Sequence, residues 1–247
     1  MARRYLAFDI ETAKDVPGDD FNWRPHRPLG ISCAATLASG CDDVRVWHGK
    51  IEAGAPAARM TVQDVTELLQ YLCAMADDGF TILTWNGLGF DFDILAEESA
   101  AAAHCQTCAL GHVDMMFHIV CALGYPVALD KGAQGMGLPG KPAGMTGFLA
   151  PRLWAEGQHQ QVLDYVAQDV RMAMRIAEAA EQRRRFEWIT RKGTKSQMPL
   201  PNGWLTVNES LKLPEPDTSW MSSPLKRRDF MGWIPLPDRR GTRCPST

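Results

Sequence analysis

The sequence lacks any long run of apolar residues. Although 45% of its 247 residues are hydrophobic, no stretch approaches the roughly 18 to 20 apolar residues that a membrane-spanning helix requires. At the start of the chain, Asp9 interrupts the apolar residues before the core of a secretory signal could form. These absences argue against membrane-spanning and secreted classes, so we expect a cytoplasmic protein with enough apolar residues for one large core.

A disulfide framework is also missing. The seven cysteines are an odd number without regular spacing, which is typical of a reducing compartment. Cys105 and Cys108 form one Cys-x-x-Cys pair with His104 and His112 nearby, which supplies enough ligands for a small zinc site. Because a second cysteine pair is absent, a loop with two incidental thiols is the preferred interpretation.

A surplus of basic residues, common in nucleic-acid-binding proteins, is absent from the chain as a whole, which has a formal net charge of −3. The charge is unevenly distributed, because residues 1–182 contain 13 Lys and Arg against 23 Asp and Glu, whereas residues 183–247 contain 13 against 6. An acidic body suits a site for divalent cations, and a basic extension suits contacts to phosphates. Ordinary solvated surfaces would account for the same charges.

The apolar pattern predicts three opening strands in an antiparallel meander, followed by alternating helices and strands. The expected strands are residues 5–11, 30–37, 44–48 and 81–85, and the expected helices are 61–79, from 90 onward, 113–123 and 159–184. The first of these helices begins at an N-cap, Thr61. Residues 130–151 are rich in Gly and Pro and predict a loop with one short helix. This order is typical of a mixed α/β sheet with helices packed on it.

The composition changes after the last of these helices. Residues 186–247 hold half of the 16 prolines and four of the eight tryptophans. We therefore divide the chain into a domain at 1–185 and a basic Pro/Trp-rich C-terminal extension at 186–247, expected as an extended arm whose tryptophans pin it to the domain. Alternatively, its Lys and Arg clusters and tryptophans track a nucleic-acid strand through phosphate contacts and base stacking.

Two carboxylates share one face of the first predicted strand. Asp9 and Glu11 are two residues apart, so their side chains point to the same side among apolar residues, where unpaired charges are costly. They require a positive partner, which is either an arginine in a structural ion pair or a bound cation.

Asp91 follows the sequence Asn86-Gly-Leu-Gly-Phe and opens a predicted helix, where it shares a face with Ile94 and Leu95. That spacing favours an inward position, although helix capping would equally explain an Asp there, and Asp93 competes for any role. Asp114, at the start of a later helix, is interpreted as an N-cap rather than as part of a site.

The long helix at 159–184 carries a further candidate. Asp169 falls within its apolar stripe, with Tyr165 one turn before it, so its side chain needs a partner. His159 and Asp164 offer a competing pattern, with histidine in place of tyrosine. We reject it because Asp164 falls on the polar face of the helix.

Three acidic patterns therefore follow one another along the chain: Phe8-Asp-Ile-Glu-Thr12, Asn86-x-x-x-Phe-Asp91 and Tyr165-x-x-x-Asp169. They resemble the three exonuclease motifs of the DEDD superfamily, tyrosine subclass (DEDDy). The resemblance covers roughly residues 5–180. Within the superfamily, the sequence is most similar to the exonuclease domain of family B DNA polymerases and to related stand-alone bacterial exonucleases.

The resemblance implies an RNase H-like fold and two Mg²⁺ or Mn²⁺ ions held by Asp9, Glu11, Asp91 and Asp169. It assigns Asp9, Glu11 and Asp169 to the ion that generates the attacking hydroxide. Asp9, together with Asp91 through water, is assigned to the ion that faces the leaving 3′ oxygen. Tyr165 is expected to orient the attacking water.

The same motifs imply substrate contacts from Thr12, Asn86 and Phe90. Lys131 and Lys141, in the loop before the long helix, are further candidates for contacts to substrate phosphates, although surface lysines are common without such a role.

We therefore expect a metal-dependent 3′-to-5′ exonuclease that acts on single-stranded DNA 3′ ends and releases nucleoside 5′-monophosphates, with a polymerase or repair protein as a possible partner and no membrane association. An exoribonuclease with the same carboxylates and a non-catalytic nucleic-acid-binding module are the alternatives.

Overall fold

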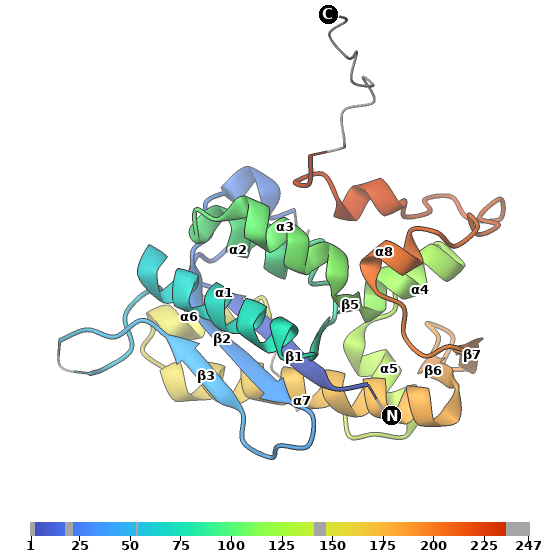
Figure 1. Ribbon diagram of the computed structural model, residues 1–247, viewed down its shortest axis with the longest axis horizontal. Coiled ribbons are helices and arrows are strands. Elements are labelled where there is room, and N and C mark those ends of the chain that lie inside the picture. Colours follow the sequence, from blue (N-terminus) through green and yellow to red (C-terminus); the bar gives the residue numbers. More distant parts are fainter. Residues whose placement is uncertain (1–2, 18–21, 53, 141–146, 236–247) are drawn as a thin grey trace, which may run out of the picture.

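The computed structural model describes residues 3–17, 22–52, 54–140 and 147–235, and a five-stranded sheet lies at its centre (Figure 1). The strands stand in the order β3-β2-β1-β4-β5. Their bounds are β1 Tyr5–Thr12, β2 Ile31–Ala38, β3 Arg45–His48, β4 Thr81–Thr84 and β5 Val113–Asp114. The pairs β1–β2 and β2–β3 are antiparallel, as the predicted meander requires, whereas β1–β4 and β4–β5 are parallel.

Helices cover both faces of this sheet. They are α1 (Val62–Asp77), α2 (Asp91–Glu98), α3 (Ala102–Gly111), α4 (Met115–Leu123), α5 (Leu129–Met136), α6 (Ala150–Ala155) and α7 (His159–Arg183). Figure 1 shows α7 along one side of the sheet and α1, α2 and α3 along the other. The mixed α/β fold with a mixed central sheet and flanking helices is the predicted RNase H-like class, and this prediction is confirmed.

Alternation along β1 divides the core into two layers. Tyr5 and Ala7 pack with α7 in one apolar cluster, while Leu6, Phe8 and Ile10 pack with α1, α2 and α3 in the other. Since side chains two residues apart share a face, Asp9 and Glu11 follow Ala7 toward α7.

The structure has more helix than the sequence predicted. Residues 130–151 were expected to be a loop with one short helix; α5 is such a helix at the start of this range, and α6, which was not expected, begins at its end. The Cys-x-x-Cys segment was expected to lie in a loop, and it lies in α3 instead. By contrast, α1 begins at the predicted cap, where Thr61 and Asp64 form a reciprocal capping box.

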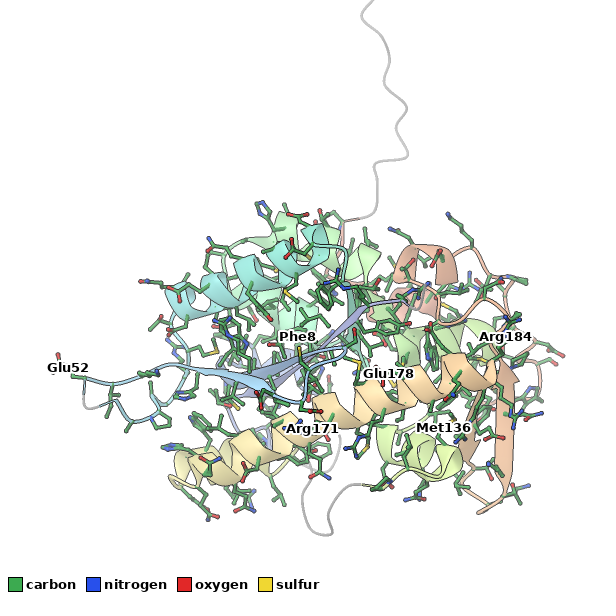
Figure 2. The ribbon with its side chains drawn as sticks, turned by 60° about the horizontal axis from the view of Figure 1, so that its bottom comes forward. Phe8, Glu52, Met136, Arg171, Glu178 and Arg184 are labelled. Carbon is green, nitrogen blue, oxygen red and sulfur yellow. The ribbon has the colours of Figure 1, made fainter. Side chains whose placement is uncertain are left out.

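The C-terminal extension contains more regular structure than the predicted extended arm. Its elements are the hairpin β6 (Arg185–Ile189) and β7 (Lys195–Pro199), the short helix α8 (Val207–Ser210) and a 3₁₀ turn at Arg227–Phe230. The hairpin forms because Gly193, with φ +77°, turns the chain between two pairing strands. Figure 2 shows Arg184 at the end of α7, where the chain enters this hairpin.

Tryptophans attach the extension to the domain, as predicted, although not all of them do so. Trp188 and Trp204 are buried in the same cluster as α7, whereas Trp220 is 70% exposed. No helix among the residues described above combines the length and apolar character needed to cross a membrane.

Candidate metal centre

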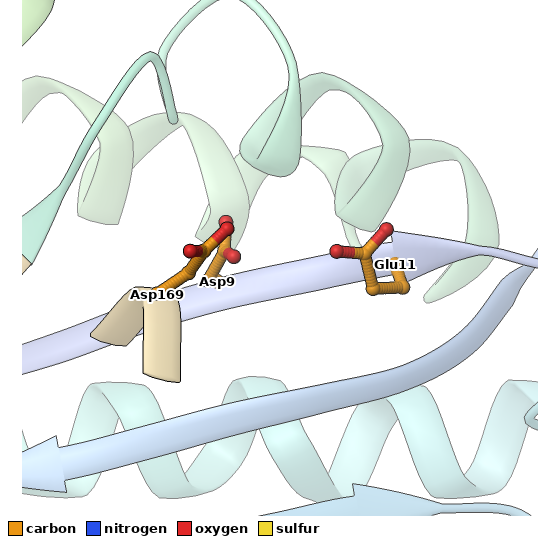
Figure 3. Close-up of side chains that lie close together, drawn as sticks. All are labelled: Asp9, Glu11 and Asp169. Atoms are coloured by element: carbon orange, nitrogen blue, oxygen red, sulfur yellow. The ribbon is translucent and has the colours of Figure 1, made fainter. Parts of the chain in front are cut away.

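Three carboxylates meet between the sheet and α7. Asp9 and Glu11 extend from the same side of β1, and Asp169 reaches them from the middle of α7 (Figure 3). One carboxylate oxygen from each residue lies within 4.8 Å of the other two. Among the described residues, no other group of three or more His, Cys, Asp and Glu side chains places its ligand atoms close enough together to hold one metal ion.

Local sequence explains why these side chains meet. On β2, the residues that pair with Asp9 and Glu11 are Ala35 and Cys33, which are small and fully buried. On α7, Asp169 takes a buried position among apolar residues that contact the sheet, as its place in the helical stripe predicted.

The donor set suits a hard divalent cation, because Mg²⁺ and Mn²⁺ prefer carboxylate oxygens. Glu11 is 6% exposed and Asp169 is 7% exposed. Holding three carboxylates so close together, with two of them buried, is unfavourable unless positive charge is added, since like charges repel and buried charges lose hydration. The residues present therefore fit a metal site at this position.

Asp91 stands beside this group without belonging to it. As the first residue of α2, it accepts a hydrogen bond from the Ile10 amide through Oδ1, at 3.0 Å, and its side chain is hydrogen-bonded to that of Asp9. Burial raises the pKa of Asp91 to about 7, although these hydrogen bonds act in the opposite direction. A hydrogen bond between two carboxyl groups requires a proton on one of them, which the raised pKa of Asp91 allows in the absence of metal.

Asp93, the competing acid of the same helix, has a different role. It lies 2.6 Å from the Arg27 guanidinium and 3.7 Å from that of Arg24. This buried carboxylate thus forms a structural ion pair, which separates it from the three-carboxylate group.

Tyr165 lies one turn before Asp169 and is hydrogen-bonded to its carboxylate. Burial, followed by the negative charges of Asp169, Glu11 and Asp9, raises the pKa of the Tyr165 hydroxyl above its usual range. The phenol therefore remains protonated and donates its hydrogen bond to the Asp169 carboxylate.

The carboxylates line a pocket of about 210 Å³. Of the predicted substrate contacts, Thr12 and Phe90 line this pocket and Asn86 does not, while Lys141 lies outside the described residues. Sequence reasoning missed several other lining residues, among them Lys14, Val16, Phe148 and Pro151. Lys14 brings a positive charge to the acidic pocket, and its Nζ donates to the His26 carbonyl at 2.7 Å.

Asn86 instead shapes the turn that leads into α2. Its backbone is left-handed, with φ 75°, and its amide donates to Asp114 Oδ1 at 2.9 Å. Asp114 also accepts from the amides of Leu88 and Phe117. The predicted N-cap role of Asp114 is confirmed by the bond to Phe117, and the sequence contained no signal for its two bonds to the turn.

The competing histidine pattern lies outside this centre. Asp164 is exposed and accepts a hydrogen bond from Gln160, and it borders a larger pocket of about 380 Å³ on the solvent face of α7, with Arg171 and Arg175. His159 packs against the Trp154 ring. The prediction that Asp164 faces solvent is confirmed.

The candidate zinc ligands do not assemble among the described residues. Cys105 is buried within α3, and the sulfur of Cys108 lies 3.3 Å from that of Cys73 on α1. The His112 side chain is directed elsewhere, because its Nε2 is bonded to Thr84 Oγ1 at 2.9 Å.

No model of a known protein family and no curated protein sequence matches this chain. Among solved structures, it is similar to the family B DNA polymerase from the hyperthermophilic archaeon Pyrobaculum calidifontis, with a TM-score of 0.51 and 20% sequence identity. The similarity covers 73% of this chain and 25% of the polymerase chain. The chain thus spans about a quarter of the polymerase it matches. At this sequence identity, the similarity is one of fold.

Proposed function

We propose that the protein is a metal-dependent 3′-to-5′ exonuclease, which hydrolyses single-stranded DNA and releases nucleoside 5′-monophosphates. The observation that carries this proposal is the joining of Asp9 and Glu11 on β1 with Asp169 on α7. These residues come from the first and third acidic motifs, and Asp91 of the second motif contacts Asp9. We take DNA as the polymer because the solved structure with the similar fold is a DNA polymerase, and RNA is the alternative that the test below includes.

Four carboxylates would hold two Mg²⁺ or Mn²⁺ ions. Asp9, Glu11 and Asp169 would hold the first, and Asp9 with Asp91 would hold the second. When bound, such a pair activates the attacking water and stabilises the leaving 3′ oxygen of an in-line displacement.

The remaining residues of the pocket would orient the reactants. The Tyr165 hydroxyl, which stays protonated, would orient the attacking water by exchanging its hydrogen bond to Asp169 for one to the water. Thr12 and Phe90, which line the pocket, would contact the terminal nucleotide. We propose Lys14 as a phosphate contact because it is a cation on the wall of an acidic pocket. Asn86 and Lys141 remain proposed substrate contacts from the motif resemblance, and a polymerase or repair protein remains a proposed partner.

The test is release of nucleotides from a 5′-labelled single-stranded DNA with Mg²⁺ or Mn²⁺, beside an RNA of the same sequence. A ladder that shortens from the 3′ end is expected, together with nucleoside 5′-monophosphate in the products. EDTA, Asp9→Ala and Asp169→Ala should each abolish the ladder. The matched control is Asp164→Ala, an exposed acid on the same helix, which should retain activity.

Each other outcome has a defined meaning. Faster shortening of RNA would replace DNA with RNA as the substrate. Cleavage that survives in Asp169→Ala would exclude this centre as the active site. If neither polymer is cut with either metal while the variants remain folded, the protein is better described as a non-catalytic nucleic-acid-binding module.

A further inference from the structure

The part of the C-terminal extension that holds Phe230 and Trp233 lies against the turn that leads into Asp91. The Trp233 indole Nε1 donates to the Leu88 carbonyl at 2.8 Å, across 145 residues of sequence. Phe230 is buried, with its ring edge-on to Phe117. A Cβ atom on Gly89 would stand 2.9 Å from Cδ1 of the Phe230 ring, so the ring fills the space that glycine leaves. The extension thus contacts this turn through one hydrogen bond and one close apolar contact.

The same turn is held on its other side by Asp114. The Leu88 amide donates to Asp114 Oδ2 at 2.9 Å, and the Leu88 carbonyl accepts from Trp233. The backbone amide of Leu88 is therefore held by Asp114 at the start of α4, and its carbonyl is held by the extension. Since Leu88 is fully buried, losing either partner would leave a buried polar group without its bond.

The turn determines where Asp91 lies. The amide of Phe92 donates to the Gly87 carbonyl at 2.8 Å, which closes the turn onto the first residues of α2. Asp91 is the first residue of α2, and its Oδ1 accepts from the Ile10 amide on β1. The backbone of Asn86 is left-handed, a conformation that asparagine adopts more readily than other non-glycine residues, so the side chain type suits this turn. External contacts on the turn therefore bear directly on the Asp91 carboxylate.

We propose that Phe230 and Trp233 form a C-terminal brace that positions Asp91 against β1. Their part in catalysis rests on the proposed nuclease function, but the geometric effect does not. The brace gives this part of the extension a role independent of strand binding, because it acts through the Asn86–Phe90 turn rather than through a nucleic-acid contact.

The first test measures hydrogen exchange of the Ile10 amide by NMR in the metal-free protein. Trp233→Phe retains a ring but removes the indole donor, and it should speed Ile10 exchange by about tenfold through local opening. The matched control is Trp220→Phe, whose indole bonds to Asp217 within its own loop and should leave Ile10 unchanged. Unchanged Ile10 exchange in Trp233→Phe would overturn the brace.

A second pair of variants tests the ring contact. Gly89→Ala should also speed Ile10 exchange, because the added methyl group meets Phe230. Combining it with Phe230→Leu should restore protection, since the smaller side chain makes room. Two independent, additive effects would show that the two residues do not act through each other.

Activity supplies the third readout. Trp233→Phe should raise the metal concentration for half-maximal nuclease activity roughly three- to tenfold, because Asp91 helps hold one ion. An unchanged metal requirement would reject the catalytic part of the proposal. If the wild-type protein cuts no nucleic acid but Ile10 exchange responds as expected, the proposed function fails and the brace stands.

Discussion

Asp169 occupies a position of α7 that its neighbours fill with apolar side chains. Val162, Val166 and Ala173 on the same stripe are all buried. A carboxylate in this stripe loses hydration and lies close to Asp9 and Glu11, so in the absence of a cation it costs stability. The same arrangement should make the folded state bind divalent cations more tightly than the unfolded chain, in which the three residues are apart.

The first prediction concerns Asp169→Asn. The variant should be more stable than the wild-type protein in EDTA, because one of three close charges is removed. Saturating Mn²⁺ should raise the wild-type melting temperature by roughly 5 to 10 °C, on the order of 2 to 3 kcal/mol at 100 times the dissociation constant. The variant should show a much smaller rise. Differential scanning calorimetry with and without Mn²⁺ measures both effects.

Asp164→Asn is the control for this prediction, since it removes the same charge from the exposed face of the same helix. It should show the wild-type response to Mn²⁺. An equal metal response in Asp169→Asn and the wild-type protein would contradict a metal site at the three carboxylates.

Local periodicity was enough to predict which acids face the core. The two-residue repeat of a strand placed Asp9 beside Glu11, and the helical repeat separated Asp169 from Asp164. The pocket residues Lys14 and Phe148 could not be predicted in this way, because their nearness to the carboxylates arises from how loops lie over the sheet. No short sequence pattern records that arrangement.

Helix α4 joins the domain to the extension through a buried histidine. The Leu205 amide donates to Nδ1 of His118 at 3.2 Å, and the imidazole packs edge-on against the Trp204 ring at 5.5 Å. Burial lowers the pKa of His118 to about 4. The ring must be neutral to accept the Leu205 bond, so its protonation opposes the docking of the extension on α4.

The second prediction is a pH dependence of stability that His118 carries. Because its pKa is lower in the folded state than the usual value of about 6.5, the unfolded chain binds more protons between these pH values, and stability falls as pH falls. Through this histidine, acidification from pH 7 to pH 5 should lower the free energy of unfolding by about 2 kcal/mol. Urea unfolding of the wild-type protein and His118→Gln at both pH values measures the difference.

Comparing the two proteins isolates His118 from other groups that titrate in this range. Burial also lowers the pKa of His112 to about 4, so acidification destabilises both proteins to the same extent through this residue. The variant should therefore lose less stability than the wild-type protein on acidification. Equal losses in the two proteins would show that His118 is not neutral in the folded state or is not buried by the extension.

Helices were predicted closely where capping, periodicity and composition agreed, and less closely where glycines lie inside a helix. α1 carried a cap, an apolar stripe and a terminal glycine, and it was predicted closely. α5 contains Gly132 and Gly135, which reduce helix propensity, so the sequence predicted a loop with one short helix there without giving its bounds. The structure explains both, because a Cβ at Gly135 would lie 2.2 Å from the Trp188 backbone and one at Gly132 would press on Phe186. Close packing of β6 on α5 requires these glycines.

At the scale of the whole molecule, composition separated an acidic body from a basic extension but did not indicate that they share a core. Phe186 and Trp204 of the extension lie fully buried in the cluster that contains α7, and Val207 belongs to the second cluster. Composition gives the number of tryptophans in a segment, whereas their burial depends on the tertiary contacts that the segment makes with the rest of the fold. The division at residue 185 therefore stays a prediction about sequence character rather than about independent folding.

The last prediction tests whether the extension is part of the folding unit. Trp204 is fully buried between Phe186 and His118, and Trp204→Ala should destabilise the protein by about 3 to 5 kcal/mol, as expected when a large core side chain leaves a cavity. Trp220→Ala, which shortens a side chain that is 70% exposed, should change stability by less than about 0.5 kcal/mol. Urea unfolding followed by both circular dichroism and tryptophan fluorescence measures these changes.

Because the Trp204 cluster also contains the face of α7 that packs on β1 and β2, both probes should report one transition. A chain that ends at Arg185 should then lose cooperative unfolding, since it lacks Phe186, Trp188 and Trp204 and exposes the apolar surface they cover. If that truncated chain unfolds in one transition at the wild-type urea concentration, or if Trp204→Ala costs less than about 1 kcal/mol, the extension is attached to the domain without stabilising it.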